Sequence, residues 1–415
     1  MFKETLITND AIVLGILFFL LYFIFDRNKN GGNYWQKFYK FFPPILLCYF
    51  LPGLLNSLGI ISGEESQIYP VVSRYLLPPC LLLFTLSLDI DMLKKLGFKA
   101  VLVFLAGTFG VLIGGPIAVL IVKAISPETF SGGNAETWRG LATVAGSWIG
   151  GGANQTALKE VFQPSGLLFS QSVAVDILVA ETWLALLLLG VANRARMNKF
   201  FGSNSDLIDE IKENLEAKAK EKRAIPTYED YLKILAVGFG GTAIAYFCSD
   251  LITPFIATNY PGLAQFSLTS SFFWVVVIVT IIGIVLSQTK VRDIEHVGAT
   301  KVAMVFLYIL IAAIGMQMSL VAIADNPMLF LVGIIWIIIH AICIVTAGKL
   351  LKVPYFFVAV GSQANVGGAA SASVVAAAFH PSLISVGVIL SVLGYAVGTY
   401  AGYITAQLIR LASGQ

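Results

Sequence analysis

Ten long apolar segments constrain the fold of this chain more than any other feature. They lie near residues 8–25, 44–61, 74–92, 100–124, 168–193, 231–250, 271–287, 302–323, 328–348 and 383–409. A helix needs roughly 20 apolar residues to cross a hydrocarbon core of about 30 Å. Inside lipid every backbone polar group must find a partner within the protein, and helices provide this. The sequence therefore predicts an all-α polytopic membrane protein, located in a cell membrane as a multi-pass chain.

The composition excludes several other classes of protein. The 415 residues are 57% hydrophobic and only 12% charged, whereas soluble domains carry about 25% charged residues. So few charges cannot cover an ordinary soluble enzyme, nor do they fit a disordered chain. The net charge of +3 is too small and too scattered to indicate nucleic-acid binding. We therefore expect the lipid bilayer and a small-molecule substrate as partners, and no nucleic acid.

Lysine and arginine predict the orientation of the chain. Alternate loops hold 21 of the 27 basic residues, and such loops are typically cytoplasmic, which would place the N-terminus outside. Two further apolar segments, near 140–160 and 354–379, are crowded with Gly, Ala, Ser and Asn. If the first were a simple crossing, the strongly basic loop 194–230 would lie outside. We therefore predict that both segments enter and return, or break within the membrane.

The two halves of the chain resemble each other around these segments. GSWIGGGANQT begins at Gly146 and GSQANVGGAAS begins at Gly361, and each motif is followed by a Phe-x-Pro. Each half then consists of five spans and one Gly-rich element, and an odd number of crossings inverts the second half. Inverted repeats are typical of secondary transporters. The predicted organisation is repeat 1 over 1–193, a cytoplasmic linker over 194–230, with a polar helix near 206–222, and an inverted repeat 2 over 231–415.

Breaks in membrane helices expose backbone dipoles that can bind solutes and ions, and nearby polar side chains can add ligands. The substrate-binding candidates are Ser147, Asn154, Gln155, Ser362, Gln363 and Asn365, and those for a Na⁺ site are Thr156, Asp176, Gln317 and Ser371. Asp176 lies deep in an apolar segment, where an acid is costly and usually functional. Tight helix packing by small residues is the alternative explanation of the glycines.

The two motifs, GSWIGGGANQTALK from Gly146 and GSQANVGGAASAS from Gly361, resemble a membrane family known only as domain of unknown function number 819. More distantly, the layout is similar to the glutamate–sodium symporter family. That resemblance implies two five-span repeats with re-entrant or broken elements, a homodimer, elevator-like movement and sodium-coupled transport of amino acids or organic anions. Neither Gly-rich element contains an arginine for a carboxylate, which departs from a glutamate site.

The function expected from the sequence is secondary active transport. A Na⁺ or H⁺ gradient would drive symport of a small organic solute such as an amino acid, peptide or organic anion. A channel or passive exporter is the alternative. A membrane enzyme would need a buried acid–base or metal cluster, which the sequence does not suggest, so we expect no enzymatic activity. A scaffold subunit would not need paired irregular elements.

Overall fold

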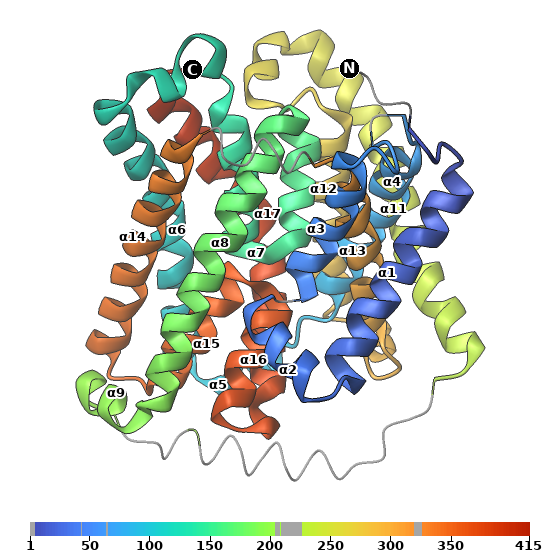
Figure 1. Ribbon diagram of the computed structural model, residues 1–415. Coiled ribbons are helices and arrows are strands. Elements are labelled where there is room, and N and C mark those ends of the chain that lie inside the picture. The colour runs from blue at the N-terminus through green and yellow to red at the C-terminus, as the bar shows by residue number, and fades with distance from the viewer. Residues whose placement is uncertain (1–4, 43, 64, 204–207, 209–225, 319–325) are drawn as a thin grey trace.

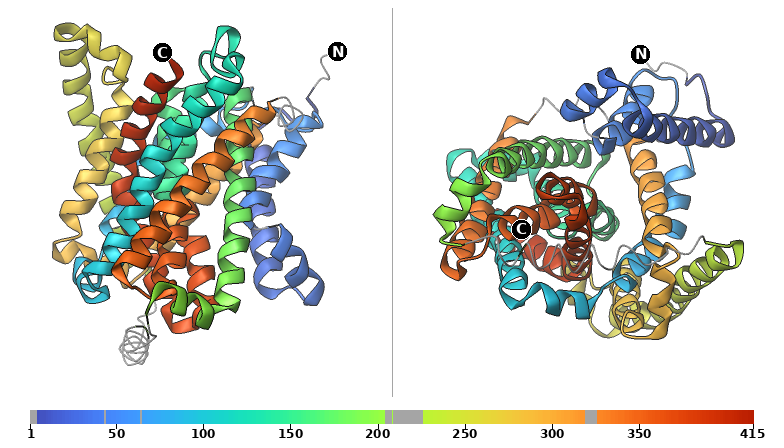
Figure 2. Two further views of the ribbon diagram at one scale, coloured as in Figure 1. Left: turned by 90° about the vertical axis from the view of Figure 1, so that its left-hand side faces the viewer. Right: turned by 90° about the horizontal axis from the view of Figure 1, so that it is seen from below.

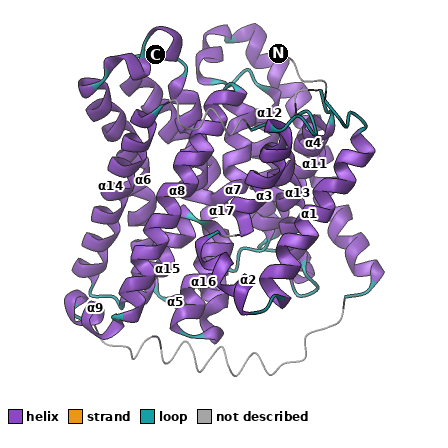
Figure 3. Ribbon diagram, viewed as in Figure 1, coloured by secondary structure: helices purple, strands orange, loops and turns teal. Residues whose placement is uncertain are grey.

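A computed structural model describes residues 5–42, 44–63, 65–203, 208, 226–318 and 326–415. Within these ranges the secondary structure is helical, apart from one isolated bridge between Ile7 and Ile61 (Figure 3). The α-helices are α1 Asp10–Asn30, α2 Asn33–Phe41, α3 Pro44–Ser57, α4 Ile68–Leu86, α5 Ile90–Leu96, α6 Phe98–Ile125, α7 Thr137–Phe162, α8 Gly166–Ala192, α9 Arg194–Phe201, α11 Tyr228–Asn259, α12 Ser271–Leu286, α13 Ala299–Met316, α14 Pro327–Leu351, α15 Tyr355–Val366, α16 Gly368–Phe379 and α17 Ile384–Ser413. Short 3-10 turns include η1 Pro127–Phe130, η2 Gly132–Asn134, η3 Pro261–Phe266, η4 Lys290–Glu295 and η6 Pro381–Leu383.

Seven helices in the described part of the chain are long and apolar enough to cross a membrane, namely α4, α6, α8, α11, α13, α14 and α17 with its preceding turn. This confirms the prediction of an all-α, multi-pass membrane protein. The remaining three predicted spans fall on α1, α3 and α12. Of these, α3 has 14 residues and α12 has 16, fewer than the roughly 20 that a straight crossing needs.

Several boundaries differ from the sequence-based prediction. The third predicted span, 74–92, is shifted, because α4 begins at Ile68 and ends at Leu86. Asp89 lies beyond it, where its carboxylate caps α5 and pairs with Arg292 at 2.5 Å. The predicted linker 194–230 begins with helix α9, and its last residues belong to α11. Most of the predicted polar helix at 206–222, and the end of the predicted span 302–323, lie outside the described residues.

The helices form two packed groups (Figures 1 and 2). The hairpin bundle consists of α6, α7, α8 and α14 to α17, which pack mainly on one another. The outer bundle consists of α1, α3, α4 and α11 to α13. The two bundles meet where α4, α12 and α13 contact α7 and α17. This boundary is where the Gly-rich elements lie.

Both chain termini lie at one end of the molecule, which we call the terminal end (Figure 1). The opposite end, the basic end, carries α5, α9, η4 and the C-terminus of α14. Arg292 of η4 pairs with Asp89, the N-cap of α5, and Lys99 at the start of α6 donates from Nζ to the Leu351 carbonyl of α14 at 3.2 Å. The basic residues of these described segments therefore share one end, as the positive-inside pattern requires.

Glycines bring the backbones of α6 and α14 close together. A Cβ on Gly110 would lie 2.8 Å from the Cα of His340, and one on Gly114 would lie 2.7 Å from the Trp336 ring. Small residues at such crossings are how membrane helices approach closely without a hydrophobic driving force between them. The Trp336 indole N–H then donates to the Val111 carbonyl at 2.7 Å. Close packing thus explains these glycines, as distinct from those of the two Gly-rich elements.

Candidate functional site

The first Gly-rich element, α7, is a re-entrant hairpin, which we call hairpin 1. A straight helix of 26 residues would place its ends about 39 Å apart. Instead, Arg139 Nη1 near the start donates to the Phe162 carbonyl at the end, at 2.6 Å, and the Trp138 and Phe162 rings are 5.4 Å apart. The reversal occurs at Gly150 and Gly151, whose backbone angles are not helical. The first arm spans 137–149 and the second spans 152–162.

The second Gly-rich element forms hairpin 2 from α15 and α16. The chain breaks at Gly367 and Gly368, and Gly368 has a positive φ of 67°. The ring of Phe356 at the start lies 5.2 Å from that of Phe379 at the end, so the two arms are antiparallel. The sequence predicts that each Gly-rich element enters and returns or breaks within the membrane, and both elements break at their glycines.

The two hairpins enter from opposite ends and their tips meet in the middle of the bundle (Figure 1). A Cβ on Gly151 would lie 3.4 Å from the Cα of Gly368, and one on Gly368 would lie 3.5 Å from the Cα of Gly151. Tyr395 of α17 lies beside both tips, and its hydroxyl accepts the Ala369 N–H at 3.4 Å. Non-helical backbone at this depth is tolerated only where protein buries it or where it lines a watery cavity.

Gly151 tests this geometry. Its φ of 68° with ψ of −174° is open almost only to glycine. We expect Gly151→Ala to lower the free energy of unfolding by about 1–3 kcal/mol, as measured by denaturant unfolding in detergent. Gly152→Ala is the matched control, because its Cβ would meet nothing closer than 3.7 Å. Equal stability of the two variants would contradict the strained tip.

Two buried asparagines pin the hairpins to neighbouring helices. Asn154 Nδ2 donates to the carbonyls of Gly150 at 3.1 Å and Tyr395 at 3.2 Å, and Thr399 Oγ1 donates to Asn154 Oδ1 at 2.8 Å. On hairpin 2, Asn365 has an equivalent set of partners: the carbonyls of Gly361 and Phe104, and the hydroxyl of Thr108. Both side chains are fully buried. In this conformation their amides therefore hold the hairpins rather than a substrate.

The pinning role predicts a stability loss. Asn365→Ala would leave buried backbone carbonyls and the Thr108 hydroxyl short of partners, which costs about 1–3 kcal/mol. Asn259→Ala is the control, since Asn259 makes the same bond to a carbonyl four residues earlier, at 2.8 Å, but is exposed. Thermal unfolding of both purified variants is the measurement. A melting temperature for Asn365→Ala that matches that of the control would show that the pin does not stabilise the protein.

Asp176 anchors a polar network on hairpin 1. Its two carboxylate oxygens accept the Trp148 indole N–H at 2.6 Å and the Gln155 Nε2 at 2.7 Å, and Ser147 also hydrogen-bonds to it. Tyr49 of α3, in the outer bundle, donates to Gln155 Oε1 at 3.0 Å. The structure thus brings together three of the sequence-predicted residues, Ser147, Gln155 and Asp176, around one buried acid.

The serine of the second motif has a matching position on hairpin 2. Ser362 Oγ lies 2.8 Å from His340 Nε2 and accepts the Trp183 indole N–H at 2.7 Å. His340 Nδ1 lies 2.9 Å from the Gly107 carbonyl, which can only accept, so Nδ1 carries the proton. Nε2 of a neutral imidazole is then an acceptor, and the Ser362 hydroxyl donates to it. Ser362 is thus fully engaged, and it connects hairpin 2 to α8 and α14.

The remaining candidates are spread around the tips. Gln363 is 1% exposed and its Oε1 has no hydrogen-bond partner among the described residues. Thr156 Oγ1 donates to the Gly152 carbonyl at 2.9 Å, and Ser371 packs beside Gly367. Gln317 lies instead with Lys159. Asp176 in turn bonds to Trp148 and Gln155. Each of the four residues proposed for Na⁺ therefore contacts a different set of partners.

Sequence reasoning did not single out Lys159, which the structure places in a contact between the two bundles. This lysine of hairpin 1 is 9% exposed. Its ammonium donates to Gln317 Oε1 at 3.0 Å and lies 3.5 Å from the centre of the Tyr69 ring. Both partners belong to the outer bundle, so Lys159 links the two bundles. A signal was present, because Lys159 is the only basic residue in 140–160, and charges within apolar membrane segments are typically functional.

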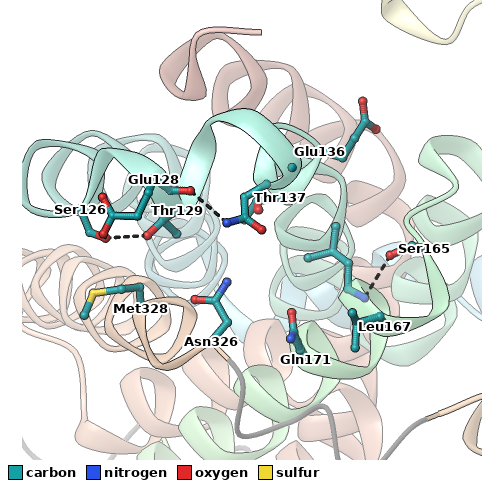
Figure 4. A pocket seen from close by; sticks show the side chains of 13 residues that line it. Ser126, Glu128, Thr129, Glu136, Thr137, Ser165, Leu167, Gln171, Asn326 and Met328 are labelled. Atoms are coloured by element: carbon teal, nitrogen blue, oxygen red, sulfur yellow. Dashed lines mark hydrogen bonds between the residues drawn. The ribbon is translucent and has the colours of Figure 1, made fainter.

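A polar cavity of about 450 Å³ lies near the base of hairpin 1 (Figure 4). Its lining includes Glu128, Thr137, Gln171 and Asn326, from η1, α7, α8 and the residue before α14. The Ser126 hydroxyl donates to Glu128 and holds the pKa of that carboxyl below its usual range. An ionised carboxylate therefore stands at this mouth, which favours the approach of cations.

The fold and the hairpins define a multi-pass membrane protein with two opposed re-entrant elements. The chain belongs to the family described as "Protein of unknown function (DUF819)", whose model matches residues 15–412. It is also similar to a curated relative, the uncharacterized membrane protein YjcL of Bacillus subtilis (strain 168). The two are 22% identical over 355 residues, which cover 84% of this chain and 85% of the relative.

Proposed function

We propose that this protein is a secondary active transporter that couples a Na⁺ or H⁺ gradient to symport of a small organic solute, such as an amino acid, a peptide or an organic anion. One observation carries the proposal: two re-entrant hairpins enter from opposite ends, and their glycine tips touch at Gly151 and Gly368. Secondary transporters typically bind substrate where two discontinuous elements meet near the midplane. Gln363, buried beside the second tip with an unpartnered Oε1, is the best-placed substrate ligand.

The two bundles suggest how access would alternate. The proposed repeats, 1–193 and 231–415 with the linker between them, each contribute three helices to the outer bundle, and a hairpin with its two flanking helices to the hairpin bundle. We propose that these repeats are inverted and that the hairpin bundle slides against the outer bundle. The polar contacts Tyr49–Gln155 and Lys159–Gln317 would break and reform in this movement. A homodimer would hold the outer bundle still.

Asp176 is the proposed coupling residue. Its carboxylate is buried and receives hydrogen bonds from neutral donors, so a proton or Na⁺ is the partner that would neutralise it. Acids at such positions are costly in a membrane and are retained at ion and proton pathways. Transport chemistry of this kind needs no enzymatic group, and we propose no catalytic activity.

A channel is the rival function that shares the same elements. A channel needs a continuous pore between the hairpins, whereas the two glycine tips lie in contact with each other. That contact favours alternating access. In liposomes, solute uptake through a channel would not depend on a cation gradient, whereas uptake through the proposed symporter would.

A ligand screen tests the proposal. Purified protein would be heated with amino acids, short peptides and organic acids, in NaCl and in KCl, at two pH values. A true substrate present at 100 times its Kd adds about 2.7 kcal/mol of stability, and we expect this shift to require the coupling cation. Uptake of the stabilising compound into liposomes would then follow the cation gradient. Stabilisation with gradient-independent uptake would refute coupled transport.

A further inference from the structure

An elongated apolar groove is lined by side chains of α8 and α14, two helices that lie on one face of the hairpin bundle (Figure 2, left). It combines two cavities of about 400 and 420 Å³ that share Trp183 and Leu186 in their linings. The first cavity is lined almost entirely by apolar side chains, and several of them, such as Leu178 and Ile338, are about half exposed. Both helices are long enough to span a bilayer, so hydrocarbon is the natural medium for this surface.

The groove changes character at the basic end. The second cavity includes Asn193, Arg196 and Tyr355 in its lining. Arg196 is exposed on α9, a helix that also carries Arg194 and Lys199 and no acidic residue. The groove is therefore apolar along the membrane-spanning helices and cationic at its basic end. These two regions match the acyl chain and the anionic headgroup of a phospholipid.

We infer that the α8–α14 groove binds one anionic phospholipid, with an acyl chain along Trp183 and Leu186 and the phosphate on Arg196. Basic pockets between membrane helices on the cytoplasmic side recognise anionic headgroups in this way. A second copy of this chain fits less well, because a two-fold partner would present the same three bases, which form no ion pair among the described residues, at the same depth. The inference goes beyond transport and holds whether or not the protein carries a solute.

The bound lipid would contact a residue that positions hairpin 2. Trp183 lines both cavities, and its indole N–H binds Ser362 at 2.7 Å. Tyr355, at the start of hairpin 2, lines the second cavity and donates its hydroxyl to the Leu187 carbonyl at 2.9 Å. The lipid site thus lies directly against the supports of hairpin 2.

Native mass spectrometry of the full chain in detergent tests this inference. The probe is an equimolar mixture of phosphatidylglycerol and phosphatidylcholine. We expect the wild type to retain phosphatidylglycerol preferentially, and Arg196→Gln to reduce that retention about fivefold, as expected for loss of one basic contact. Arg194→Gln is the matched control, because it removes the same charge from the same helix but does not line the groove. Arg196→Lys keeps the charge and should retain most of the lipid.

Ala341→Trp tests the acyl-chain part, because Ala341 lines the apolar cavity and a tryptophan would fill it. We expect this variant to lose the bound lipid while remaining monodisperse. If it misfolds, the comparison of Arg196→Gln with Arg194→Gln still decides. Equal losses for these two arginine variants would overturn the inference, as would full lipid retention in folded Ala341→Trp. A wild-type dimer that Ala341→Trp separates, with no change in bound lipid, would assign the groove to a second copy and also overturn it.

Discussion

Replacing Asp176 with asparagine is expected to reduce gradient-driven solute uptake to background while the protein still folds. The substitution keeps the shape of the side chain and removes the charge. Its new amide would face Gln155, but the Gln155 amide can turn over, so that its Oε1 accepts from Asn and its Nε2 donates to Tyr49. The Trp148 indole keeps its acceptor. The Tyr49 hydroxyl then accepts from Gln155 while its own proton loses the Oε1 acceptor, so we expect a modest loss of stability, about 1–3 kcal/mol, beside the loss of coupled uptake.

The measurement is uptake of the solute into liposomes under an imposed Na⁺ or H⁺ gradient, with thermal unfolding as the check on folding. Asp250→Asn is the matched control, because Asp250 is an exposed acid in the C-terminal third of α11 and should leave uptake unchanged. Gradient-driven uptake by Asp176→Asn at the wild-type rate would remove Asp176 from the coupling mechanism.

The second large effect is expected for Gly398→Ala in α17. A Cβ at this position would lie 2.7 Å from the Cα of Gly150 and 2.9 Å from its backbone nitrogen. Backbone atoms at a hairpin tip cannot move aside as a flexible side chain can. We expect a loss of about 1–3 kcal/mol from overpacking, together with loss of transport, because α17 would be pushed away from the tip of hairpin 1.

The control variant, Gly240→Ala, is expected to change the stability in the opposite direction. Gly240 lies in α11, and a Cβ there would meet nothing within 4 Å. Alanine is the better helix former by up to about 1 kcal/mol, so Gly240→Ala should stabilise the protein slightly. Comparing the thermal unfolding of the two variants separates the cost of overpacking at the hairpin tip from the gain in helix propensity that both alanines bring. A stabilising effect of Gly398→Ala would contradict the close approach of α17 to hairpin 1.

The break in each Gly-rich element was predictable from the sequence. Gly150, Gly151, Gly367 and Gly368 permit backbone angles that end a helix, and the distribution of basic residues favoured segments that either return to the side they came from or break within the membrane. The ends of the spans were less predictable. Thus α4 begins six residues before its predicted start, because Ile68, Tyr69, Val72 and Ser73 are buried by packing within the protein, which local hydropathy does not reveal.

The partners of the site residues could not be predicted, because they come from distant parts of the chain. Asn154 bonds to Thr399, which is 245 residues away, and Asn365 bonds to Thr108, 257 residues away. The sequence predicts both asparagines as substrate-binding residues. Only the packing of α6 and α17 reveals that their amides are occupied, so our proposal assigns the solute to Gln363 and the cation to Asp176.

Sided labelling of the hairpin tips tests the central claim most directly. Single cysteines at Gly152 and Ser371, in a variant lacking the four native cysteines, would be exposed to a membrane-impermeant maleimide from either side of oriented vesicles. Gly262→Cys, in the exposed turn η3, is the labelling control. Its reaction shows that the maleimide reaches the side of the membrane on which η3 lies. We predict that both tip positions react from one side at a time, and that the coupling cation changes which side. Reaction from both sides at once, or from neither under any condition, would contradict a transporter whose binding site lies between the tips.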